Sequence, residues 1–319
     1  MSEADGVYDG SAASSGDRPD LIVVGAASRD VTPDDPRGWR LGGAVAYGSL
    51  ASARLGLRVG CVVGVDGPAA EATELGLLEA AGVLVRRVPL DHGPVFENIE
   101  GDGHRRQRWL SASDPVPPAA LPMEWRGARG WLLGPVAGEV APEWADLAVA
   151  HEDARVAVGW QGLLREFATD GWVKRVDPAR SPLLEIAGLV CASVDDVAPG
   201  VGLADLRAFA QRATIVLTAG DRGGLAMRDS RLVRYPAIRA PQIVDPTGAG
   251  DVFLAALLAV WLRYEEVATS RALRFAAAAG SCAVEGAGLA GVPTEAQVIA
   301  RLRSMGAPPG PGVPSRRPQ

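Results

Sequence analysis

The residues best placed to do chemistry lie in one short stretch, residues 243–251, which runs directly into a long apolar segment. Gly248 and Gly250 carry no Cβ atom, so the backbone can turn sharply there and come close to a ligand. The first amides of the helix expected next have no intrahelical partner, and with the helix dipole they favour an anion. Asp251 stands at this point, where a carboxylate can take a proton from a hydroxyl that attacks a phosphate. An acidic residue in the first turn of a helix is also a common structural choice, so Gly-x-Gly-Asp alone leaves both interpretations open.

The longer string Asp-Pro-Thr-Gly-Ala-Gly-Asp over residues 245–251 resembles the signature of the ribokinase-like (PfkB) carbohydrate kinases. The resemblance implies that Asp251 is the catalytic base. It also implies that the amides of Gly248, Ala249 and Gly250 form an anion hole for the transferred phosphoryl group. The donor implied is ATP, with Mg²⁺ bridging its phosphates, and the partner is a small polyhydroxylated substrate.

A second match concerns the donor side. A buried strand over residues 214–218 ends in Thr-x-Gly, and in the family such a Thr and Gly border the ATP phosphates and ribose. The loop near residue 286 resembles the family loop that lines the adenine, although helix capping by glycine explains part of it. The residues predicted to bind the donor are Thr218, Gly220, Asp245, Thr247, Gly286 and Gly288.

The acceptor side is predicted from the first third of the chain. Asp30 follows the expected first strand, and ligands of open α/β sheets gather at the carboxyl ends of strands. Gly42 and Gly43 resemble the family's Gly-Gly pair, but Tyr47 stands where the family usually has Asn. Tyr47 therefore indicates a flatter or more apolar acceptor, or a core position. Asn98 resembles a lid residue facing the acceptor, and an exposed strand residue is the alternative.

One weaker match concerns the metal. Ser193 and Asp196 have the spacing of the family's Asn-x-x-Glu, which organises Mg²⁺ through water, but not its residue types. Asp196 is the candidate metal residue because oxygen ligands suit a hard cation. An acid at a helix N-terminus is the alternative interpretation.

Composition excludes several other classes. The single lysine, Lys174, lies in Trp-Val-Lys-Arg, so the chain lacks a Walker A loop and the strand lysine of protein kinases. A net charge of −6 gives no support for nucleic-acid binding. No apolar run reaches the length that spans a bilayer, and the N-terminus has no signal-peptide core. We therefore expect a cytoplasmic protein that contacts neither nucleic acid nor membrane.

Alternating strands and helical runs predict an α/β fold, and the resemblance makes it ribokinase-like: a doubly wound, mainly parallel sheet flanked by helices, with a small β-lid. We expect disordered tails over residues 1–19 and 305–319, one kinase domain over residues 20–304, and a lid from residues 31–41 and 93–111. Exposed strand edges of the lid could pair two copies into a homodimer.

The resulting hypothesis is an ATP-dependent kinase that phosphorylates a hydroxyl of a sugar. A cyclitol of the myo-inositol type is a serious alternative acceptor, because residues 245–251 and the missing Asn both resemble inositol kinases of this family. A nucleoside is a further alternative. A non-catalytic relative that binds a sugar or nucleotide is the alternative from another class.

Overall fold

The structure, a computed structural model, describes residues 18–101 and 104–306. The two predicted tails lie almost entirely outside these residues. The last described helix, α9 (Glu295–Gly306), extends two residues past the predicted domain end.

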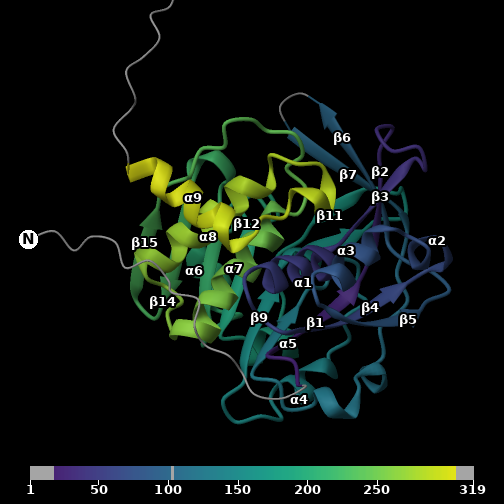
Figure 1. Cartoon of the computed structure of the whole chain (residues 1–319), viewed down its shortest axis with the longest axis horizontal. Coiled ribbons are helices and arrows are strands. Elements are labelled where there is room, and N and C mark those ends of the chain that lie inside the picture. Colours follow the sequence, from purple (N-terminus) through teal and green to yellow (C-terminus); the bar gives the residue numbers. More distant parts are fainter. Residues whose placement is uncertain (1–17, 102–103, 307–319) are drawn as a thin grey trace, which may run out of the picture.

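A nine-stranded sheet forms the centre of the molecule, with strand order β15-β14-β13-β12-β9-β8-β1-β4-β5 (Figure 1). Seven neighbouring strands are parallel, and the hairpin β14–β15 extends one edge in antiparallel fashion. The strands are β1 (Leu21–Ala26), β4 (Val59–Val65), β5 (Leu84–Pro89), β8 (Gly130–Leu133), β9 (Arg155–Gly159), β12 (Leu189–Ser193), β13 (Thr214–Thr218), β14 (Gly224–Arg228) and β15 (Arg231–Tyr235).

Helices cover both faces of this sheet, which explains why its strands are continuous apolar runs. Leu21 and Val23 of β1 pack with α1 (Ala44–Arg54), α3 (Glu74–Ala80), α7 (Ala249–Tyr264) and α8 (Ser270–Ala283). Ile22 and Val24 point the other way and pack with α4 (Trp144–Ala148), α5 (Pro182–Ile186) and α6 (Leu203–Arg207). The predicted doubly wound α/β fold is therefore confirmed.

A separate four-stranded sheet, ordered β3-β2-β6-β7, forms the predicted lid. Its strands are β2 (Ser28–Val31), β3 (Trp39–Gly42), β6 (Val95–Gly101) and β7 (His104–Ser111). The lid begins at Ser28, earlier than predicted, because β2 follows β1 almost without interruption. In Figure 1 the tips of β6 and β7 project beyond the central sheet.

Two features were not predicted. One is a break that separates α2 (Gly67–Ala70) from α3, and Asp66 caps α2 by accepting a hydrogen bond from the Ala69 amide at 3.0 Å. A hairpin of β10 (Arg165–Phe167) and β11 (Val173–Arg175) leaves the central sheet after β9. It reaches the lid through an isolated bridge between Trp172 and Arg108 of β7. Among the residues described, no helix is long and apolar enough to cross a membrane.

Candidate active site

Most of the predicted site residues meet in one cavity of about 1500 Å³ at the carboxyl ends of the central strands. Typical ligand pockets measure roughly 300–1,000 Å³, so this cavity has room for two small ligands. The predicted residues that line it are Asp30, Gly43, Tyr47, Asn98, Asp196, Thr218, Gly220, Thr247, Gly248, Ala249, Gly250 and Asp251.

Four predicted residues are not in the cavity lining: Gly42, Asp245, Gly286 and Gly288. Gly42 instead makes room for Asp30, since a Cβ at Gly42 would lie 2.3 Å from an Asp30 carboxylate oxygen. Asp245 ties two loops together, because it accepts hydrogen bonds from the amides of Thr247 at 2.9 Å and Gly288 at 3.0 Å. These contacts support a structural part for Gly42 and Asp245 in shaping the site.

The Gly-Ala-Gly turn has the geometry that the sequence predicted. Gly248 is the N-cap of α7 at φ 76°, a backbone conformation that favours glycine. A Cβ at Gly250 would meet no atom within 4 Å, so the backbone there faces open space in the cavity. The Ala249 amide already donates a 3.3 Å hydrogen bond to the Pro246 carbonyl, a weak bond that an anion could displace.

Asp251 sits in the first turn of α7, half-buried, and lines the cavity. Burial raises the pKa of Asp251 to about 7, and the negative charges of Asp196 and Asp30 add to the increase while Arg165 opposes it. A general base is most effective when its pKa lies near the working pH. Asp251 is thus suited to accept a proton at neutral pH.

Tyr47 proves to be both a cavity residue and a packing residue. Its side chain is 2% exposed, and its ring lies close to residues 245–250, the predicted anion loop. A Cβ at Gly248 would fall 2.4 Å from that ring. Burial raises the pKa of the Tyr47 hydroxyl, and the charges of Asp30, Asp245 and Asp251 raise it further, so the hydroxyl stays protonated. Tyr47 is therefore a buried residue that also lines the cavity, and its part in selecting the acceptor stays a prediction.

The lid side of the cavity combines polar groups with an aromatic wall. The Ser28 hydroxyl donates to Asp30 at 3.0 Å, and the Gln107 amide donates to Asn98 Oδ1 at 3.0 Å. Phe96, which is 3% exposed, lines the same space. An apolar wall with a few convergent carboxylate and amide groups suits a polyhydroxylated ring.

Asp196 lies on the opposite wall and is surrounded by donors. One of its oxygens accepts hydrogen bonds from Gln161 at 3.1 Å and from Arg165 at 3.2 Å, and the other accepts from the Ser193 amide at 3.1 Å. The predicted Asp196 metal site therefore has one carboxylate that is already well hydrogen-bonded. The described residues contain no group of three or more metal-ligating side chains. Asp196 is the residue that would hold Mg²⁺ here, through water, and the ion would then neutralise charge on a phosphorylated donor.

The Glu139 carboxylate joins two segments that lead into the cavity lining. The carboxylate is fully buried and accepts hydrogen bonds from the amides of Val136 at 3.0 Å and Ala137 at 2.7 Å, and a longer one from Ala26 at 3.4 Å. Burial raises the pKa of this carboxyl above its ordinary value. Glu139 connects the end of β1, which leads to Ser28, with the loop after β8, which contributes Val136 to the lining.

The sequence interpretation missed Gln161, Arg165 and Glu139. Gln161 and Arg165 could have been found, since they follow a parallel strand and ligands gather at such ends. Glu139 carries no such signal, because its partners are backbone amides that the fold alone brings together. Gly286 and Gly288 stay predictions, and Gly288 has φ 53° as the first residue of the 3-10 helix Gly288–Gly291.

Comparisons with known proteins agree with this fold. Residues 192–296, which contain Asp196 and the anion loop, match the model of the pfkB family carbohydrate kinase. The chain is 33% identical over 271 residues to inositol 3-kinase of Oryza sativa subsp. japonica, covering 79% of this chain and 66% of that protein. It is 36% identical over 166 residues to inositol 3-kinase of Arabidopsis thaliana, covering 50% of this chain and 45% of that protein. The chain thus spans less than two thirds of the length of these relatives.

The fold has solved counterparts. A pyrophosphate-dependent kinase in the ribokinase family, described as a sulfate complex, superposes with a TM-score of 0.69 at 18% identity. That match covers 88% of this chain and 99% of the other. The described chain thus has the fold of that ribokinase-family kinase, and its residues 192–296, with the signature at residues 245–251, match the pfkB family carbohydrate kinases.

Proposed function

We propose that this protein is a kinase that transfers the γ-phosphoryl group of ATP to a hydroxyl of a small polyhydroxylated molecule. The observation that carries the proposal is Asp251, a carboxylate with a pKa near neutrality at a glycine turn that opens on the cavity. Asp251 takes the proton of the attacking hydroxyl. The amides of Gly248, Ala249 and Gly250 stabilise the charge on the transferred group, as preorganised donors do in other enzymes. Mg²⁺ bound with the donor phosphates would neutralise part of their charge.

Among the acceptors considered, we favour a cyclitol of the myo-inositol type over a sugar. The relatives reported above are named inositol 3-kinases, and one solved structure of this fold is described as a kinase complexed with a pyrophosphate analog and myo-inositol. The flat aromatic surfaces of Tyr47 and Phe96 beside Asp30 and Asn98 support a ring with hydroxyls around its edge. A non-catalytic relative has no need for a base with a pKa near neutrality.

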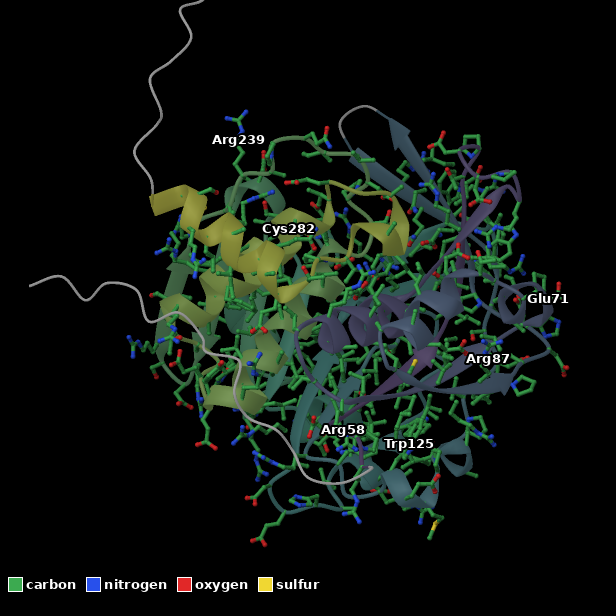
Figure 2. The ribbon with its side chains drawn as sticks, viewed as in Figure 1. Arg58, Glu71, Arg87, Trp125, Arg239 and Cys282 are labelled. Carbon is green, nitrogen blue, oxygen red and sulfur yellow. The ribbon has the colours of Figure 1, made fainter. Side chains whose placement is uncertain are left out.

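The donor is proposed to be ATP because the cavity continues well beyond the anion loop. It passes Thr218 and Gly220 and extends along the loop from Ala237 to Ile243. Ile243 is 70% exposed and offers an apolar surface that a base could cover. Arg239, on the same loop, projects outward at the rim (Figure 2). Pyrophosphate is the second candidate donor, because solved structures of this fold are described as pyrophosphate-dependent kinases.

A panel experiment tests this proposal. The purified protein is incubated with ATP or pyrophosphate, Mg²⁺, and cyclitols, hexoses, pentoses or nucleosides, and phosphorylated products are identified by ³¹P nuclear magnetic resonance. We expect ATP-dependent phosphorylation with myo-inositol or a related cyclitol as the best acceptor. Preference for an aldose or a nucleoside overturns the assignment of a cyclitol as acceptor. Preference for pyrophosphate overturns the assignment of ATP as donor. Binding without turnover for every donor and acceptor overturns the proposal that the protein is a kinase.

Pairing of two copies through the lid is also only proposed. Strands β3 and β7 are the edges of the lid sheet, and β7 already bridges to Trp172. Strand β3 would therefore supply the pairing edge.

A further inference from the structure

The β10–β11 hairpin contributes arginine side chains to the cavity lining, and the reaction proposed above gives these arginines no role. Arg165 of β10 and Arg175 of β11 both line the cavity and lie directly opposite each other in the antiparallel register. Side chains of directly opposed residues lie on the same face of a strand pair, and like charges in this position destabilise it. An anion between the two guanidinium groups would remove that repulsion.

Arg165 is also held toward the reacting groups. Its side chain is 12% exposed and pairs with Asp196 at 3.2 Å. Gln161 binds the same carboxylate oxygen, so the guanidinium is restrained on the side that faces Asp196. Arg165 is close enough to Asp251 for its charge to act on that carboxylate. The arginine thus lies within electrostatic reach of the base, in a partly desolvated site where charge interactions are strong.

We propose that Arg165 is a catalytic residue that contacts the transferred phosphoryl group from the hairpin side of the cavity, with Arg175 as its auxiliary partner. The inference rests on the proposed kinase function. In the transfer step, the acceptor oxygen bonds to the γ-phosphorus and the bond to the bridging oxygen of ADP breaks. The hydroxyl proton passes to Asp251, and the electron pair of the broken bond leaves on ADP. Arg165 neither gains nor loses a proton and stabilises the negative charge on the phosphoryl oxygens.

The central test replaces Arg165 by Gln and by Lys. We expect R165Q to lower kcat by about 10²–10³-fold, the usual effect of losing one charge-stabilising donor. The KM for the acceptor should change little, because the contact forms with the migrating group. R165K should recover part of the loss, since lysine keeps the charge but not the planar fork. R175Q should have a smaller effect in the same direction.

Binding of a transition-state mimic gives a second readout. ADP with aluminium fluoride and Mg²⁺ should bind the wild type tightly by calorimetry, and R165Q should lose this gain while ADP alone binds as before. Arg155 offers a matched control, because its side chain is 16% exposed and pairs with Glu265 at the amino end of β9. R155Q should keep the turnover of the wild type.

A structural role for Arg165, as the counter-charge of Asp196, predicts a different pattern. In R165Q alone, the Asp196 carboxylate loses its counter-charge, and this loss could itself lower activity. The variants D196N and R165Q/D196N have no carboxylate at this position, so a comparison of the two separates the roles. If R165Q has no effect on kcat or on aluminium fluoride binding in the D196N background, the catalytic assignment is overturned. A comparable loss in that background supports it. Absence of turnover in the wild type refutes the proposed function itself, and the Arg165 proposal, which rests on that function, falls with it.

Discussion

At the scale of single residues, the site depends on a carboxylate that folding makes more basic. The pKa of Asp251 rises from 3.8 to about 7, chiefly because burial disfavours its charged form. A carboxyl whose pKa is raised in the folded state costs stability at every pH where it must ionise. The penalty is absent below the unfolded pKa, grows as the pH rises, and is complete above about pH 7.

This linkage predicts the stability of D251N. At pH 8 the variant should be more stable than the wild type by up to about 4 kcal/mol, since one pKa unit corresponds to roughly 1.4 kcal/mol. The gain should shrink as the pH is lowered and vanish near pH 4. Urea unfolding at pH 4, 6 and 8 measures it. A gain that is independent of pH would show that the Asp251 carboxyl titrates normally.

Substitution by alanine should have opposite effects on stability at the two glycines of the turn, Gly250 and Gly248. G250A should leave stability unchanged or slightly improved, because alanine is the better helix former and its Cβ meets no atom within 4 Å. Its methyl group would occupy the space proposed for the phosphoryl group, so turnover should fall by at least about tenfold. Thermal unfolding and steady-state kinetics measure both effects. An active G250A would show that this space is not used.

G248A should instead damage the fold around the turn. Gly248 has φ 76°, and an added Cβ would lie 2.4 Å from the ring of Tyr47. Backbone strain and overpacking each cost about 1–3 kcal/mol, so we expect a clear loss of stability in urea unfolding. Stability equal to that of the wild type would contradict the packing of Tyr47 against the loop.

At the scale of elements, the site is assembled by connections between strands that are distant in sequence. Glu139 is the clearest case, because its carboxylate joins the end of β1 to the loop after β8 through Ala26, Val136 and Ala137. The lid is attached at the same point, since β2 follows β1 directly. Rigid support of this kind is what a preorganised site requires.

Replacement of Glu139 tests this support. E139A should lower the free energy of unfolding by about 2–5 kcal/mol, because it leaves buried amides without an acceptor and opens a cavity. E139Q keeps the shape and one acceptor oxygen, so it should be less destabilising. Urea unfolding compares the two. Equal stability of E139A and the wild type would mean that the amides find other partners.

At the scale of the whole molecule, the sequence predicted the sheet, the lid and the anion loop, because each has a local pattern. Apolar runs with a glycine or threonine near their ends predict strands such as β1 and β13, and the glycines at residues 248 and 250 predict the turn before α7. The β10–β11 hairpin could not be read, since its short strands are polar and are stabilised partly through Trp172 and the lid. Glu139 acquires its position from contacts across the fold, which no local pattern encodes, whereas Arg165 follows the carboxyl end of β9.

The central claim is that Asp251 is the base for phosphoryl transfer, and a single-turnover measurement of D251N tests it most directly. With the acceptor identified in the panel, enzyme in excess over labelled ATP, and ATP binding checked by calorimetry, D251N should bind ATP as the wild type does. Its rate of transfer should be lower by about 10²–10⁴-fold, the usual contribution of a general base. A transfer rate near that of the wild type, with ATP binding intact, would contradict the account.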